Sequence, residues 1–175
     1  MFASSLGSVT VKRNAMNKIR LAVAMVLMLP VSTYAAENDL HGTYRLVSTT
    51  HTLVDTGQVE TFTAEKGFIT YGADGRMSVL VVRGDRPKPA SLEKITDQQR
   101  ADLLRSMTAY AGTYKFDGKT VEHHVDISWN EVYTGTIQRR EVRREGDKLL
   151  LSTPASPRPQ DGKMTVRSLV WEKVK

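Results

Sequence analysis

Apolar and polar side chains alternate along most of the chain after residue 36, as they do in half-buried β-strands. The clearest case is residues 110–128, YAGTYKFDGKTVEHHVDIS, where two alternating arms flank Asp117-Gly118. Because this dipeptide favours a two-residue hairpin turn, the arms are predicted to pair about it. The predicted pairs on the apolar face are Tyr114 with Val121, Gly112 with His123, and Tyr110 with Val125. A histidine on an apolar face, opposite a glycine that leaves room above it, indicates a sheet curled around a cavity.

Alternation, β-rich composition and turn residues predict the remaining strands, which are joined by short connections without long βαβ crossovers. Two of these strands flank Asp74-Gly75, a second hairpin signal, and are apolar on both faces. The predicted strands are residues 40–50, 58–63, 67–71, 77–83, 135–143, 148–153 and 164–174. A turn at Gly146-Asp147 places Val142 beside Leu151. We therefore predict an all-β fold, a closed antiparallel up-and-down β-barrel of eight or nine strands, because closure hides the edges of so many strands. A two-sheet sandwich is the alternative.

A single helix is predicted within this β-rich chain. Residues 96–99, TDQQ, have the spacing of a capping box. A helical stripe of apolar residues follows and extends the prediction to about Thr108; its members are Leu103, Leu104, Met107 and Ala111. We expect this α-helix to pack at a barrel end as a plug, and a lid over the opening is the alternative.

The N-terminus has the pattern of a signal peptide, residues 1–35. From Met16 the chain reads MNKIRLAVAMVLMLPVSTYAAEN, with a basic start, an apolar run and small residues up to Ala35. The run is too short for a stable membrane-spanning helix, and a retained anchor is the alternative. Residues 1–15 are interpreted as an upstream lead. The domain then comprises residues 36–175, and we predict a periplasmic or secreted bacterial protein.

Composition and missing motifs narrow the function classes. The net charge is +6, but four basic residues lie in the leader and their removal leaves +2, so we predict no nucleic-acid partner and no stable membrane insertion after cleavage. The chain has no cysteine, which excludes a lipid-attachment cysteine and redox-thiol chemistry. It also lacks the Gly-x-Ser-x-Gly elbow and the glycine-rich phosphate-binding motifs, which removes most support for hydrolase and nucleotide-binding functions.

Several segments resemble the bacterial and fungal lipocalin-like domain proteins. They are 40–48 (LHGTYRLVS), 71–78 (YGADGRMS), 110–114 (YAGTY), 121–125 (VEHHV), 135–140 (GTIQRR) and 148–153 (KLLLST), before a late Trp171. The resemblance covers the chain after the leader and implies a calycin-type barrel. In the broader lipocalin signature, a Gly-x-Trp on the first strand packs under a basic residue from the last. Here the aromatic residue is Tyr44, and Lys173 is the candidate basic residue.

The candidate binding site is a polar minority on the inner face of the barrel, because small-molecule pockets are mostly apolar with a few convergent polar groups. The predicted ligand-binding residues are His123, Gln138, Arg140, Tyr44, Tyr110 and Tyr114. A buried guanidinium requires a partner, and a ligand carboxylate would supply one. The alternatives are that Arg140 pairs with an internal acid or reaches out at the rim. A one-residue slip would exchange it for Arg139.

His123 has three interpretations: a neutral core imidazole bonded to Gln138 or a tyrosine, a ligand contact, or a general acid or base. We predict no metal site, because His123 and His124 are neighbours on a strand and point to opposite faces. We also predict no cofactor, with haem held by one histidine as the alternative. Trp129, with Asn130, falls in a loop predicted to border the barrel mouth.

Two function classes follow. The first is an exported protein that binds a small lipophilic ligand, with or without an acidic head group, inside the barrel. The second is an enzyme of the isomerase, cyclase or hydratase type that acts on a hydrophobic molecule in the same pocket, an analogy that rests on the fold. A barrel with a filled core, which acts only through its outer surface, is the remaining alternative.

Overall fold

The structure, a computed structural model, describes residues 39–158 and 161–175 of the 175-residue chain. The predicted signal peptide, residues 1–35, lies outside the described residues. The strands are β1 (Gly42–Leu53), β2 (Val59–Phe62), β3 (Lys66–Tyr71), β4 (Arg76–Val82), β5 (Met107–Phe116), β6 (Thr120–Ser128), β7 (Ile137–Glu145), β8 (Lys148–Ser152), β9 (Ser156–Pro157) and β10 (Met164–Lys173). The helices are α2 (Asp97–Arg105) and a short 3₁₀ helix, η1 (Glu131–Tyr133).

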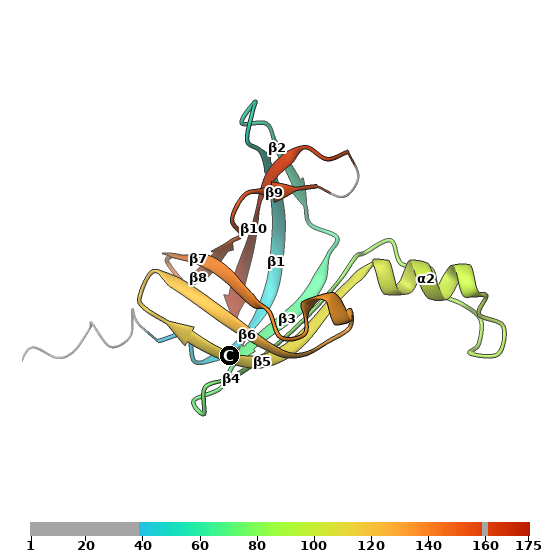
Figure 1. Ribbon diagram of the computed structural model, residues 1–175, viewed down its shortest axis with the longest axis horizontal. Coiled ribbons are helices and arrows are strands. Elements are labelled where there is room, and N and C mark those ends of the chain that lie inside the picture. The colour runs from blue at the N-terminus through green and yellow to red at the C-terminus, as the bar shows by residue number, and fades with distance from the viewer. Residues whose placement is uncertain (1–38, 159–160) are drawn as a thin grey trace, which may run out of the picture. The chain divides into compact units, whose positions relative to one another are not determined.

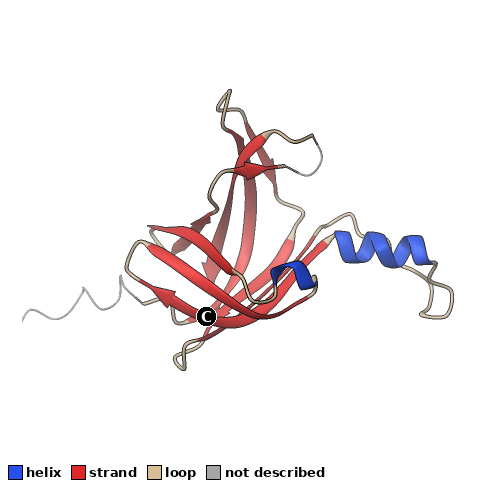
Figure 2. Ribbon diagram, viewed as in Figure 1, coloured by secondary structure: helices blue, strands red, loops and turns tan. Residues whose placement is uncertain are grey.

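Eight of the strands form a closed antiparallel barrel, which confirms the predicted architecture (Figures 1 and 2). Their order is β1-β3-β4-β5-β6-β7-β8-β10, and β10 pairs back onto β1 to close the barrel. The short strands β2 and β9 are additional: β2 pairs with β1 near Thr52, and β9 pairs with β10 at Thr165. They lengthen the wall at one end only, and this end is the barrel mouth.

The barrel interior is filled by every second side chain of each strand, as the pleat of a β-strand requires. In β4, for example, Met77, Val79 and Val81 are buried while Leu80 is 49% exposed. The most deeply buried large side chains are Trp171, Tyr44, Tyr71, Leu40, Ile69, Leu149 and His123. A buried side chain of this size contributes about 1.5–3 kcal/mol, so the closed interior is the main source of stability.

The end opposite the mouth is closed by the start of β1 and the end of β10. Tyr44 is cross-strand partner to Lys173, and the Lys173 Nζ lies 5.8 Å from the centre of the Tyr44 ring. Gly42 has a φ of +129°, and a Cβ there would stand 2.7 Å from the Lys173 Cε. Tyr44 and Lys173 therefore form the contact that the sequence suggested for the aromatic and basic pair.

The predicted register of the β5–β6 hairpin is wrong by two residues. Tyr114 pairs with His123, and Gly112 pairs with Val125. The Asp117 Oδ1 accepts hydrogen bonds from the backbone N–H groups of Lys119, at 2.8 Å, and Thr120, at 2.6 Å, and this moves the turn from Asp117-Gly118 to Gly118-Lys119. Because the shift is an even number, His123 remains on the inner face.

A β-bulge in the same hairpin gives Gly112 a different role from the one predicted. Gly112 pairs with Val125 but Ala111 pairs with Ile127, so Asp126 is an extra residue in β6 and Tyr110 pairs with Ser128. A Cβ on Gly112 would overlap the carbonyl oxygen of His124. The glycine thus allows the two backbones to approach at the bulge, and it does not open space above the histidine.

The predicted capping box is present in α2. The Gln99 backbone N–H donates to the Thr96 Oγ1 at 3.2 Å, and the Thr96 N–H donates to the Gln99 Oε1 at 3.0 Å. The predicted extension to Thr108 is wrong, because Met107 pairs with Val82, and the last two residues assigned to the stripe, Met107 and Ala111, belong to β5. Strand pairing overrides the weak helical periodicity there.

The helix α2 leaves the mouth end of the barrel between β4 and β5 (Figure 1). None of its residues is buried, so it does not fill the barrel in the way a plug would. Its C-terminus is held by Arg86, whose Nε donates to the Ser106 Oγ at 3.1 Å. Within residues 39–158 and 161–175, no helix has the length and apolar character needed to cross a membrane.

Candidate functional site

A small cavity of about 60 Å³ lies inside the barrel. Its polar lining residues are Thr108, Tyr110, His123, Arg140, Thr153 and Arg167, and the rest of the wall is aliphatic apart from Trp171. This volume holds a few atoms, whereas pockets for drug-sized ligands measure roughly 300–1,000 Å³. The interior is therefore neither solid nor an open lumen, and it has room for the head of a ligand but not for a long chain.

Two larger hollows lie at the mouth, and one of them adjoins the cavity. The nearer one, of about 350 Å³, shares Val81, Thr108 and Arg167 with the inner cavity. The outer one, of about 810 Å³, lies along β2 and includes Phe62. Trp129, predicted to border the mouth, lines the nearer hollow and stacks on Tyr133 with ring centres 5.0 Å apart. The mouth thus offers volume that the interior lacks, in hollows lined by both apolar and charged side chains.

His123 is held by two tyrosines from other strands. The Tyr71 hydroxyl lies 2.8 Å from the His123 Nε2, and the Tyr110 hydroxyl lies 2.9 Å from the His123 Nδ1. Burial lowers the pKa of His123 to about 3, with a further contribution from the charge of Arg140. The imidazole is therefore neutral at physiological pH. Both ring nitrogens are engaged, which leaves no free lone pair for a haem iron.

The two tyrosines that contact His123 also remain neutral. Burial raises the pKa of Tyr71 well above its usual value of 10, and the neighbouring tyrosines add to that rise. Burial also raises the pKa of Tyr110, although the positive charge of Arg140 opposes it. The Tyr71–His123–Tyr110 group is consequently an uncharged chain of hydrogen bonds, one end of which reaches the cavity at Tyr110.

Arg140 brings a positive charge to the cavity wall. It is half-buried, and its Nη1 donates to the backbone carbonyl of Arg139 at 2.6 Å. Its neighbour Arg139 is exposed and pairs with Glu122 at 2.8 Å on the outer face. Within the described residues, no carboxylate forms an ion pair with Arg140, and this unpaired charge is the most informative feature of the site.

Three of the six predicted site residues do not line the cavity. The Gln138 Nε2 donates to the Thr136 Oγ1 at 2.9 Å, and the Tyr114 hydroxyl donates to the carbonyl oxygen of Gly72 at 3.2 Å. Tyr44 lies at the closed end. The fold thus brings together His123, Tyr110 and Arg140, because only these three predicted residues lie at the same depth in the barrel.

Sequence reasoning missed Arg167 and Trp171. Counting back by two from the buried Trp171 along β10 reaches Leu169 and then Arg167, so strand alternation would have identified Arg167 as inward-facing. The Arg167 Nη2 lies 3.3 Å from the Glu65 Oε2, so this guanidinium is already paired. The Trp171 Nε1 is buried without a hydrogen-bond partner among the described residues.

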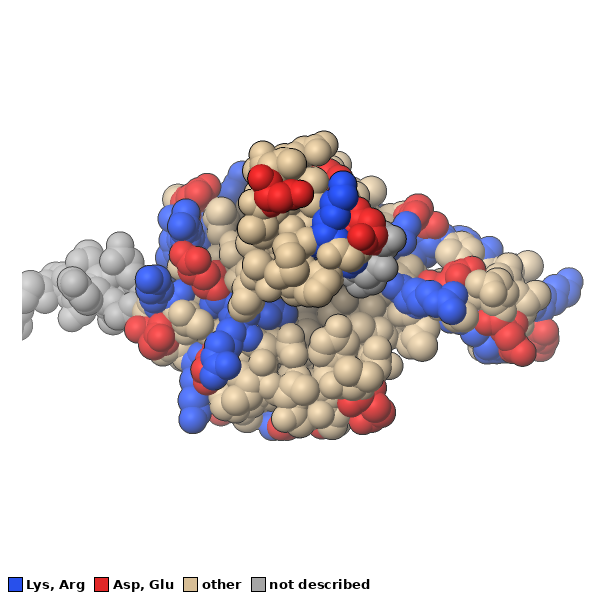
Figure 3. All heavy atoms as spheres, turned by 45° about the horizontal axis from the view of Figure 1, so that its top comes forward, with Lys and Arg blue, Asp and Glu red and all other residues tan. Residues whose placement is uncertain are grey.

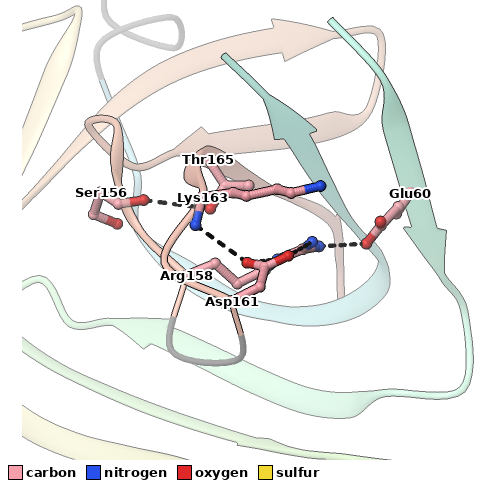
Figure 4. A network of polar contacts seen from close by, with 6 residues as sticks. All are labelled: Glu60, Ser156, Arg158, Asp161, Lys163 and Thr165. Atoms are coloured by element: carbon pink, nitrogen blue, oxygen red, sulfur yellow. Dashed lines mark hydrogen bonds and ion pairs between the residues drawn. The ribbon is translucent and has the colours of Figure 1, made fainter. Parts of the chain in front are cut away.

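The mouth is braced by a network around Arg158 (Figure 4). The Arg158 side chain is 13% exposed; its Nη1 lies 2.7 Å from the Glu60 Oε2 on β2, and its Nη2 lies 2.6 Å from the Asp161 Oδ2. Hydrogen bonding to Arg158 lowers the pKa of Asp161 to about 2. The network connects β2 with the segment that follows β9, and so fixes the two extra strands that enlarge the mouth.

Charges on the outer surface are mixed. Figure 3 shows basic and acidic side chains interspersed over the visible face, without one large patch of a single sign. His124 lies 3.3 Å from Glu122, while Asp126 pairs with Arg76 at 2.8 Å. In the part of the chain that the structure describes, no three His, Asp or Glu residues cluster as metal ligands would.

Comparison with known proteins gave one informative result. The sequence model of a family described as a lipocalin-like domain matches residues 41–174. This match includes all the barrel strands from β1 to β10. No curated protein gave a significant match.

Proposed function

The chain belongs to the lipocalin-like domain family, and from this premise we propose that its barrel binds a small lipophilic molecule with an acidic head group. The observation that carries the proposal is the guanidinium of Arg140, which faces the cavity without an acidic partner among the described residues. The Arg140 side chain is half-buried and donates to the Arg139 carbonyl, and a bound carboxylate would add charge-assisted hydrogen bonds to its guanidinium.

The volumes indicate how such a ligand would lie. The cavity of about 60 Å³ accepts a carboxylate, and the hollow of about 350 Å³ beyond it accepts the apolar part. The ligand would therefore enter head first through the mouth and leave its chain among Val81, Met107 and Trp129. This differs from the expectation that the whole ligand lies inside the barrel, because core side chains occupy most of the interior.

The proposal is tested by displacement of a fluorescent fatty-acid probe with decanoate. Arg140→Gln should weaken decanoate binding by about tenfold or more, since a hydrogen bond to a charged group contributes roughly 1.5–3 kcal/mol. Arg139→Gln is the matched control, because this neighbour lies on the outer face and should leave binding unchanged. Failure of the wild type to bind, or equal affinities for the wild type and Arg140→Gln, would contradict the proposal.

The second candidate is an enzyme of the isomerase, cyclase or hydratase type. The observation that favours it is the 2.9 Å contact between Tyr110 and His123, because a hydroxyl at a cavity wall, backed by an imidazole, is suited to proton transfer. A Tyr110→Phe variant that still binds the substrate but no longer converts it would support this function. Equal turnover by the variant would exclude Tyr110 from catalysis.

We further propose that the protein is exported to the periplasm or beyond. The support is the basic, apolar and small-residue order of residues 16–35. Expression of the full chain in a bacterial host, followed by N-terminal sequencing of the exported product, should give a protein that begins near residue 36. An uncleaved product in the cytoplasm would contradict export.

A further inference from the structure

We propose that the inner cavity selects a carboxylate over an alcohol or an amine, because Tyr71 and His123 direct the hydroxyl proton of Tyr110 into it. The inference rests on the proposed binding function and specifies the head group that the site accepts. In this arrangement Tyr110 contacts the ligand, whereas Tyr71 and His123 are positioning residues.

The direction of each hydrogen bond follows from counting protons. A neutral imidazole carries one N–H, so one of the two tyrosines donates to His123 and the other accepts from it. The Tyr71 hydroxyl is fully buried and contacts the His123 Nε2, and no other acceptor lies within hydrogen-bond distance among the described residues. Leaving the hydroxyl proton of Tyr71 without an acceptor is costly, so Tyr71 donates to Nε2. This arrangement is favoured by roughly tenfold or more over the one in which Nε2 donates to Tyr71.

The direction of the hydrogen bond between His123 Nδ1 and the Tyr110 hydroxyl is then determined. If Nε2 accepts, the proton of His123 resides on Nδ1 and is donated to the Tyr110 oxygen, 2.9 Å away. The Tyr110 hydroxyl proton is consequently not used by His123. Tyr110 is buried and lines the cavity, so the remaining direction for this proton is toward the cavity.

The remaining polar groups of the cavity are consistent with an acceptor ligand. The guanidinium groups of Arg140 and Arg167 are donors only, and the Trp171 indole N–H is an unpartnered donor. The Thr153 Oγ1 already accepts from the backbone N–H of Arg167 at 3.1 Å. Among the residues that the structure describes, no carboxylate lines the cavity, although Glu65 lies against Arg167 on the mouth side. A head group with several acceptor oxygens and no protons pairs with all of these donors, whereas an ammonium group would find acceptors only in the hydroxyls of Thr108 and Thr153.

The first test needs no ligand. The ¹⁵N chemical shifts of the histidine rings identify which nitrogen carries the proton, and His123 should be in the Nδ1–H form. Tyr110→Phe should keep that form, because Tyr71 determines it. Tyr71→Phe should give a mixture of both forms. An Nε2–H form in the wild type would overturn the inference.

The second test measures selectivity with a probe small enough for the cavity. Acetate, added to the protein at neutral pH, should move the indole N–H signal of Trp171, while the signal of Trp129 serves as the reference outside the cavity; the chain has two tryptophans. Ethanol and ethylammonium should have no such effect. Tyr110→Phe should weaken acetate binding by about tenfold. Tyr114→Phe, the matched control, should not change it, because Tyr114 lies outside the cavity.

The two proposals fail in different ways. If acetate moves the Trp171 signal in the wild type but decanoate does not bind, the lipophilic-ligand proposal is wrong and the anion-selective cavity stands. If decanoate and decanol bind equally well and acetate has no effect on Trp171, the barrel binds apolar molecules and the inferred selectivity is wrong.

Discussion

Acid should destabilise this barrel through His123 in particular. The buried imidazole has a pKa of about 3 in the folded protein, against 6.5 for a histidine in an unfolded chain. Between these values the unfolded chain binds a proton that the folded chain does not, so unfolding becomes more favourable as the pH falls from about 6.5 to about 3. Above about pH 7 the histidine is neutral in both states and contributes nothing to the pH dependence.

The magnitude follows from the size of the shift. Each pH unit within the window changes the free energy of unfolding by about 1.4 kcal/mol for one proton. Lowering the pH from about 6.5 to about 4 should therefore remove roughly 3 kcal/mol of stability through His123 alone. This is a large part of the total for a domain whose net stability is about 5–15 kcal/mol.

The assay is urea denaturation, followed by tryptophan fluorescence, at pH 7 and at pH 4. His123→Gln removes the titrating group, so the stability of the variant should fall by roughly 3 kcal/mol less than that of the wild type over this range. His41→Gln is the control for replacing a histidine outside the barrel interior, because His41 is exposed. Parallel losses in the wild type and His123→Gln would refute the reasoning, whatever the absolute stability of the variant.

Three further predictions concern the fold. Gly112→Ala should cost about 2 kcal/mol or more in urea denaturation, because the new Cβ overlaps the His124 carbonyl at the bulge; an unchanged midpoint would contradict this. Thr96→Ala removes the helix cap and should destabilise α2 by about 1 kcal/mol, seen as faster amide exchange in the helix alone. Arg158→Met should speed amide exchange in residues 154–158, in residues 161–165 and in β2, because the link to Glu60 is lost. Exchange equal to that of the wild type would show that the network does not hold the two extra strands together.

Much of the barrel wall was predictable because strand alternation is a local property. The period of two placed His123, Val121 and Val125 on the inner face even though the hairpin register was wrong, because an error of two residues keeps each side chain on its face. The turn at residues 146–147 gave the correct pairing of Val142 with Leu151 for the same local reason.

The candidate site was only partly predictable. Alternation shows that a side chain points inward, but it does not show how deep in the barrel the side chain lies. Gln138 and Tyr114 therefore entered the prediction although hydrogen bonds to Thr136 and Gly72 hold them outside the cavity. Arg167 was missed, although the same alternation along β10 would have predicted that it lies on the inner face.

The sequence by itself determined the strands, the capping box of the helix and the identity of the inward faces, because each depends on neighbours within a few residues. Tertiary structure alone decided that Tyr71, 52 positions before His123, bonds to it, and that the interior leaves only a small cavity. The physical reason is that, in a closed barrel, the relative positions of two strands depend on the register of every strand pair between them and on every bulge. These shifts together set the depth at which two inward side chains meet, and no single segment of the sequence specifies all of them.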